Sequence, residues 1–209
     1  VKKELGGFHS AKILLYSVDF AEIEECQAKG EWDRSADILS EAALNLEKAG
    51  ADFLLICTNT MHKVAPQIQE KIGIPILHIA DAAADALISA GVKKAALLGT
   101  KYTMTQAFYR DRLIARGIDV LIPDAPDVEL VNKVIYEELC LGIISDESRV
   151  QFWRMIDGMK LAGAGGGWAE GYYIHYWLYE WLFFCEAARW CEGVDYYAAP
   201  TCATCHMGA

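Results

Sequence analysis

Residues 81–123 have the sequence DAAADALISAGVKKAALLGTKYTMTQAFYRDRLIARGIDVLIP. Two amphipathic helix patterns, each stopped by a glycine, alternate here with two apolar strand patterns. The expected elements are, in chain order, Asp81–Ala90, Lys94–Gly99, Thr105–Arg116 and Val120–Pro123. Strands that alternate with helices of 10–15 residues form βαβ units. This stretch therefore predicts the α/β class, with a mostly parallel sheet covered by helices on both faces.

The same alternation extends in both directions from this stretch. Further strands are predicted at Lys12–Tyr16, Asp52–Cys57 and Pro75–His78, and further helices at Ser35–Ala49 and Asp127–Leu139. No linker is obvious within this alternation, because residues 91–99 run directly from one βα unit into the next.

The composition changes at about residue 150. Five of the six tryptophans and six of the ten tyrosines follow that position, so we treat residues 150–209 as an atypical aromatic-rich segment. Most of these aromatic side chains are expected in a core. The segment ends in Cys202-Ala-Thr-Cys205-His206, a Cys-x-x-Cys-His motif that attaches haem c through both thiols and the histidine. A zinc half-site and a redox Cys-x-x-Cys are the alternatives.

The overall composition is that of a globular protein. Of the 209 residues, 54% are hydrophobic and 23% charged, and the net charge is −10. Disordered chains lack that apolar content, and an acidic chain is a poor partner for nucleic acid or an anionic membrane. No stretch has the roughly 20 nearly uncharged residues of a membrane span, and no secretory signal is visible. The seven cysteines are therefore expected to be free thiols, catalytic residues or ligands in a cytoplasmic protein.

Cys57 is the first residue that indicates chemistry. It is expected at the carboxyl end of a buried strand, which is where open α/β sheets bind ligands. The positive end of the following helix, with His62 and Lys63 nearby in sequence, would favour a thiolate. The side chains of Thr58, Asn59 and Thr60 could hold a carboxylate together with free backbone N–H groups. The alternative is an inert buried cysteine, which is the commoner case for this residue type.

Five segments carry a resemblance to a known family: HSAKILLYSVDFAEIE, CTNTMHK, IPILHIAD, ALLGTKYTMTQAFYRDRL and EELCLGIISDESR. Together they resemble the aspartate/glutamate racemases, nearly continuously from Leu5 to Arg149. The resemblance implies two similar α/β lobes, the first over residues 1–92 and the second starting over residues 93–149. It also implies a homodimer, and racemisation of aspartate or glutamate without pyridoxal phosphate or another cofactor. It also implies one cysteine acid/base from each lobe, with Cys57 as one of them.

The resemblance further implies which residues bind the substrate carboxylates. Asn59, Thr60, Thr100 and Thr103 match the family's motif positions, and Gly99-Thr100 again stands between a strand and a helix, where anions bind. Helix capping is the alternative role of Thr100 and Thr103. The Gly-Cys-Thr-Glu motif of the family's second cysteine does not occur in the sequence, and ungapped extension of the match places Gly171-Tyr172-Tyr173 there.

The end of the chain has a second resemblance. The run WLYEWLFFCEAARWCEGVDYYAAPTCATCHMGA is similar to part of a multihaem cytochrome of the hydroxylamine-oxidoreductase type. It implies a haem held by Cys202, Cys205 and His206. The sequence therefore leaves two alternatives to a racemase. One is a haem-c electron-transfer module, and the other is a racemase fold that binds an acidic amino acid without catalysis.

Overall fold

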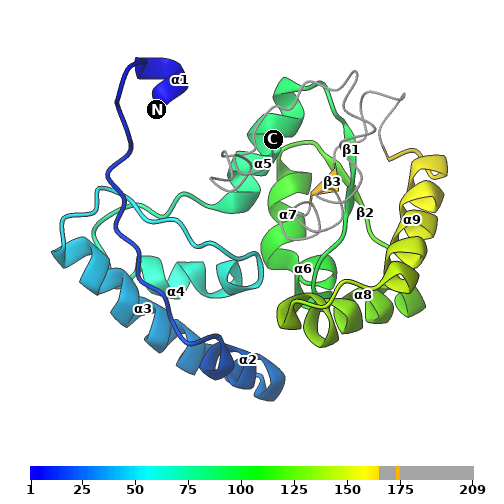
Figure 1. The fold of residues 1–209 in the computed structure, drawn as a ribbon, viewed down its shortest axis with the longest axis horizontal. Coiled ribbons are helices and arrows are strands. Elements are labelled where there is room, and N and C mark those ends of the chain that lie inside the picture. Colours follow the sequence, from blue (N-terminus) through cyan, green and yellow to red (C-terminus); the bar gives the residue numbers. More distant parts are fainter. Residues whose placement is uncertain (165–172, 175–209) are drawn as a thin grey trace, which may run out of the picture. The chain divides into compact units, whose positions relative to one another are not determined.

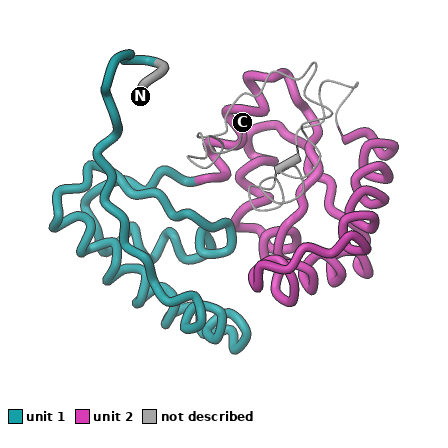
Figure 2. The backbone as a smooth tube through the Cα atoms, in the orientation of Figure 1, with its two compact units in different colours: residues 1–78 teal, residues 79–209 magenta. Residues whose placement is uncertain are grey.

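The computed structural model describes residues 1–164 and 173–174. The chain forms two compact units, Val1–His78 and Ile79–Ala209 (Figure 2), and each is described by itself. The elements of the first unit are α1 (Lys2–Leu5), α2 (Phe20–Lys29), α3 (Trp32–Lys48), the 3₁₀ helix η1 (Thr60–Val64) and α4 (Ala65–Gln69). Those of the second (Figure 1) are α5 (Ile79–Ser89), β1 (Lys94–Leu97), α6 (Lys101–Thr105), α7 (Ala107–Ala115), β2 (Asp119–Leu121), α8 (Ala125–Glu137), the 3₁₀ helix η2 (Leu139–Leu141), α9 (Asp146–Leu161) and β3 (Tyr173–Ile174).

The second unit is built on a three-stranded parallel sheet in the order β2-β1-β3. Ala96 of β1 is in register with Leu121 of β2 on one side and with Tyr173 of β3 on the other. Parallel neighbours require a crossover connection, and α6 and α7 supply it between β1 and β2. The predicted α/β class with a parallel sheet is confirmed here.

The central strand β1 buries both of its faces. Ala95 and Leu97 pack in one cluster with side chains of α5 and α7, whereas Ala96 and Leu98, the residue just after β1, pack in another with side chains of α8 and α9. Successive side chains of a strand point to opposite faces, so a strand covered on both sides is apolar throughout. This is why the run AALL carries no polar residue.

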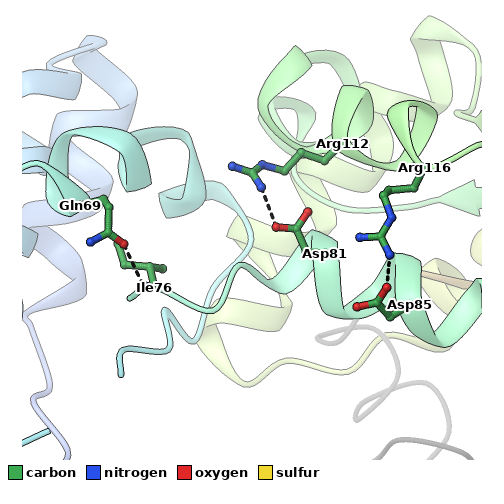
Figure 3. Close-up of polar contacts among 6 residues, drawn as sticks. All are labelled: Gln69, Ile76, Asp81, Asp85, Arg112 and Arg116. Carbon is green, nitrogen blue, oxygen red and sulfur yellow. Dashed lines mark hydrogen bonds and ion pairs between the residues drawn. The ribbon is translucent and has the colours of Figure 1, made fainter. Parts of the chain in front are cut away.

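Two ion pairs join α5 to α7 on the surface of the second unit (Figure 3). Arg112 Nη1 lies 2.6 Å from Asp81 Oδ2, and one helical turn further along Arg116 pairs with Asp85. All four side chains are 40–65% exposed, so each pair contributes at most about 1 kcal/mol. The apolar cluster beneath them, which includes Ala84, Leu87 and Leu113, is the main link between the two helices.

The first unit has its core beneath α3. Ala36 and Ala43 of this helix pack with Leu54, Val64 and other apolar side chains of η1, α4 and the segment that follows. Strand pairing among its described residues is a single parallel bridge between Leu54 and Ile76, closed by Leu54 N–H to the Pro75 carbonyl and Leu77 N–H to the Leu54 carbonyl, both at 2.9 Å.

On the edge of residues 74–77 that faces away from Leu54, the side chain of Gln69 makes the hydrogen bonds that a neighbouring strand would make. Gln69 Oε1 accepts from the Ile76 N–H at 2.9 Å (Figure 3), and its Nε2 donates to the Ile74 carbonyl at 3.0 Å. Leu54 and Gln69 therefore satisfy alternate backbone groups of residues 74–77, as two flanking strands would.

Several boundaries differ from the sequence predictions. Lys12–Tyr16 forms no strand, and Ile13 and Leu15 are about four-fifths exposed. The predicted strands Asp52–Cys57 and Pro75–His78 are reduced to the Leu54–Ile76 bridge. An apolar run favours an extended strand, but a strand forms only where a partner satisfies its backbone groups.

Three helices also depart from the expectations. Helix α2 was not predicted, although Asp19 caps it by accepting from Ala21 N–H and Gly30 ends it in the left-handed region at φ 72°. The predicted helix Thr105–Arg116 corresponds to α7, which begins at Ala107, whereas the unpredicted helix α6 ends at Thr105 and the backbone of Gln106 between them is extended. Helix α9 runs across residue 150, where the composition changes.

None of the helices within residues 1–164 has the combination of length and apolar content that crossing a bilayer requires.

Candidate functional site

Cys57 lies in an irregular loop that follows the paired residue Leu54 and leads into η1. Its thiol is exposed, whereas Thr58 and Asn59 are half-buried and Thr60 is buried. The sulfur of Cys57 is therefore accessible to solvent, while the loop is anchored three residues later by the buried Thr60. The sequence also allowed Cys57 to be an inert buried cysteine. In the structure Cys26 is buried, whereas Cys57 is exposed.

Asn59 carries a polar atom without a partner. Its Oδ1 is buried and makes no hydrogen bond within the part of the chain that the structure describes. Leaving a buried acceptor unsatisfied costs free energy, so such an atom commonly marks a place where a ligand or water completes the bonding. Because the two ends of an amide side chain can exchange places, Asn59 could offer a ligand either an acceptor or an N–H donor.

The surroundings of the loop differ from the expectation in two respects. The helix after Cys57 is the five-residue 3₁₀ helix η1, which is too short to develop a sizeable dipole. The ammonium group of Lys63 lies over the ring of Trp32, 3.6 Å from its centroid, and partial burial lowers the pKa of this lysine. Lys63 therefore makes a cation–π contact with α3.

The second predicted group of site residues belongs to the other compact unit. Gly99 is buried just beyond β1, and Thr100 is the N-cap of α6, which places both at the carboxyl end of the central strand. Thr100 Oγ1 accepts from the Thr103 N–H at 3.4 Å and lies 3.2 Å from Thr103 Oγ1. Asn132 of α8 holds the same turn, because its Oδ1 accepts from the Lys101 N–H at 3.0 Å.

We expect Thr100→Ala to lower the free energy of unfolding by about 1 kcal/mol, because it removes the helix cap. Thr100→Ser keeps a hydroxyl at the same position, and serine caps helices at least as well as threonine, so we expect little change in the free energy of unfolding. Urea denaturation of both variants checks this. Equal losses in the two variants would show that the methyl group, and not the hydroxyl, matters at this position.

The structure thus groups Cys57, Thr58, Asn59 and Thr60 in one loop, and Gly99, Thr100 and Thr103 in one turn of the other unit. It does not describe Cys202, Cys205 and His206, so the haem motif lies outside the described residues.

Sequence reasoning missed one contact in the first unit. The rings of His62 and His78 lie 4.3 Å apart at 60°, although 16 positions separate them in sequence. The sequence contained a signal for this contact, because His78 ends the predicted strand Pro75–His78 and His62 comes soon after the predicted strand Asp52–Cys57. The carboxyl ends of adjacent parallel strands meet at one edge of a sheet.

No group of three or more His, Cys, Asp or Glu side chains is arranged to hold a metal ion among the described residues.

Known proteins resemble this chain over most of its described part. A Yersinia pestis structure of a candidate Asp/Glu racemase has 56% sequence identity and a TM-score of 0.71, and the match covers 78% of this chain and 71% of the other. An aspartate racemase homologue from Pyrococcus horikoshii OT3 has 32% identity and a TM-score of 0.63, with the same two coverages.

A curated relative is similar over a shorter stretch. The broad specificity amino-acid racemase RacX of Bacillus subtilis strain 168 is 34% identical over 92 residues, which are 44% of this chain and 40% of RacX. The chain thus matches less than half the length of this relative.

The sequence model of one family, described as Asp/Glu/Hydantoin racemase, matches residues 1–166. That span includes Cys57 and the Gly99–Thr103 turn and ends before the Cys-x-x-Cys-His motif. By this match over more than three-quarters of its length, the chain belongs to the Asp/Glu/hydantoin racemase family.

Proposed function

We propose that the protein racemises an acidic amino acid, aspartate or glutamate, and that Cys57 is one of its acid/base groups. The observation that carries the proposal is the exposed Cys57 thiol in the loop that follows a parallel-paired residue, within a chain of the racemase family. A solvent-accessible thiol at such a position can reach a substrate, which a core cysteine cannot.

The chemistry explains why a thiol suits this role. Racemisation removes the weakly acidic α-proton from one face of the substrate and returns a proton to the other face. A base on one side and an acid on the other achieve this, and they exchange roles when the substrate has the opposite configuration. In this scheme the Cys57 thiolate takes the α-proton of one enantiomer, or the Cys57 thiol donates a proton to the carbanion formed from the other. The second acid/base stays unassigned, because the Gly-Cys-Thr-Glu motif is missing from the sequence.

Negative charge develops next to the α-carboxylate when the α-proton leaves, so donors fixed around that carboxylate lower the barrier. We assign this role to Thr58, Asn59 and Thr60 beside Cys57. We also assign carboxylate binding to Gly99, Thr100 and Thr103 of the second unit. The unpartnered Asn59 Oδ1 supports the first assignment, and the position of Gly99 and Thr100 at the carboxyl end of the central strand supports the second.

The proposal includes catalysis without a cofactor, a homodimer and a cytoplasmic location. The competing haem-c function rests on Cys202, Cys205 and His206, and the absorption spectrum of the purified protein tests it. A Soret band would favour the electron-transfer module.

The function is tested by proton NMR of L- and D-aspartate and L- and D-glutamate incubated with the protein in D₂O, followed by chiral analysis. We expect the α-proton signal of the substrate to disappear and the opposite enantiomer to accumulate. Exchange of one enantiomer without inversion would show a working base that lacks an acid on the opposite face. Absence of exchange in all four amino acids would contradict catalysis and favour a binding role.

A further inference from the structure

Two histidines form a buried aromatic pair next to the Cys57 loop. His62 is 1% exposed and His78 is 8% exposed. Their ring centroids lie 4.3 Å apart with the planes inclined at 60°, a close contact between tilted rings. His78 follows the segment paired with Leu54, so the contact connects the ends of both paired segments of the first unit.

His62 is tied to the loop by its ring. The Nδ1 atom lies 2.7 Å from the backbone carbonyl oxygen of Thr58. A carbonyl oxygen can only accept a hydrogen bond, so the proton of this bond belongs to Nδ1. The contact therefore assigns a ring with Nδ1 protonated.

The bonded carbonyl belongs to the residue that follows Cys57. Fixing it fixes the plane of the Thr58–Asn59 peptide, and the backbone N–H of His62 also donates to the Asn59 carbonyl at 3.1 Å. Any amino acid except proline could make the second bond from position 62, but only a side chain with a donor at this distance can make the first. The side chain of His62 thus adds a specific restraint on the loop that carries Cys57.

We propose that His62 is a positioning residue that holds the Cys57–Thr60 loop through the Thr58 carbonyl, with its ring fixed against His78. The proposal rests on the assignment of Cys57 as an acid/base group. Displacement of an acid/base group by about 1 Å can cost as much as 100-fold in rate. Loss of this restraint is therefore expected to lower kcat more than it changes KM.

The first test compares two substitutions of His62 with a matched control. His62→Leu removes the donor, whereas His62→Asn retains an N–H close to the position of Nδ1. Ser40→Ala is the control, because Ser40 is also buried in the first unit and its hydroxyl also donates to a carbonyl four residues earlier, that of Ala36. We expect His62→Leu to lower kcat of α-proton exchange at least tenfold, and His62→Asn and Ser40→Ala to stay within about threefold of the wild-type protein. Equal losses in His62→Leu and His62→Asn would overturn the proposal.

The second test does not depend on racemisation. Long-range ¹H–¹⁵N correlation NMR of the unaltered protein identifies which ring nitrogen of His62 carries the proton. Protonated Nδ1 supports the proposal, and a neutral ring protonated only at Nε2 overturns it. Amide hydrogen exchange of the peptide containing residues 57–60 is expected to accelerate at least tenfold in His62→Leu and to return towards the wild-type rate in His62→Asn. An unchanged exchange rate in His62→Leu would also overturn it.

These measurements separate two kinds of failure. If the wild-type protein exchanges no α-proton, the proposed function fails, while ring protonation and amide exchange still decide the role of His62. If the protein racemises but those measurements contradict the restraint, only the positioning role fails.

Discussion

Cys57→Ser is expected to lower the rate of α-proton exchange by about 10²–10⁴-fold, the usual contribution of a positioned acid/base group. A serine hydroxyl has nearly the size of the thiol but is a far weaker acid, so it is a poor proton donor and is not available as an anion at neutral pH. Because the Cys57 side chain is exposed, the substitution should change the free energy of unfolding by less than about 0.5 kcal/mol. The measurement is the rate of loss of the α-proton signal in D₂O, with urea denaturation of the same sample.

Cys140→Ser is the matched control for this prediction. Cys140 is half-buried in η2 of the second unit, and burial raises the pKa of its thiol, which keeps it protonated at neutral pH. The substitution removes one thiol from the protein but none from the proposed site, so exchange should stay within about twofold of the wild-type rate. If Cys57→Ser exchanged as fast as Cys140→Ser, Cys57 would not be an acid/base group.

The second unit could be predicted from the sequence because its signals are local. Residues 94–97 form the predicted strand, and the helices around Asp81–Ala90 and Asp127–Leu139 lie within a few residues of their expected positions. Glycines with positive φ end the flanking segments, as at Gly91 and Gly117. Each of these elements has its own pattern of apolar residues and its own stop signal, so neighbouring parts of the chain were not needed to recognise it.

The first unit shows where such patterns are insufficient. Lys12–Tyr16 has a stronger apolar run than β2, yet β2 is a strand and residues 12–16 are not, because only β2 has a hydrogen-bonded neighbour. Pairing is a property of two segments that are distant in sequence. Gln69 is a second example of a contact that local sequence does not reveal, because nothing near it indicates that its side-chain amide will form hydrogen bonds with the backbone of residues 74 and 76.

For the candidate site, the local pattern predicted the strand-to-helix turn at Thr100 better than the surroundings of Cys57. Thr100 follows β1 and caps α6, which is the alternative role that the sequence offered, whereas Cys57 lies in an irregular loop beyond the Leu54–Ile76 bridge and not at the end of a strand. The cation–π contact of Lys63 with Trp32 and the hydrogen bond of His62 with Thr58 depend on where these side chains point, and residue spacing does not determine that. These contacts are the part of the site that required a structure.

Helix α9 shows how a change in composition can differ from a change in fold. It begins with Ser145 as N-cap, whose hydroxyl accepts from the Ser148 N–H at 3.3 Å, and it continues past residue 150 to Leu161. Phe152, Met155, Ile156 and Met159 lie along one side of it and are at most 7% exposed. All four pack in the cluster that covers Ala96 of the central strand and Leu98 just after it. The aromatic-rich composition therefore begins inside an element of the α/β unit.

Phe152→Ala should accordingly destabilise the protein by about 3–5 kcal/mol, the cost of removing a buried phenyl ring and leaving a cavity. Phe152 is 1% exposed and lies between α9 and the sheet, so little space around it can collapse. Val150→Ala on the same helix is the control, because Val150 is 66% exposed, and its effect should lie within about 0.5 kcal/mol of zero. Urea denaturation followed by circular dichroism measures both variants. Similar small losses in the two would contradict the packing of α9 against the sheet, whereas the expected difference would establish that the folded α/β unit extends beyond residue 150.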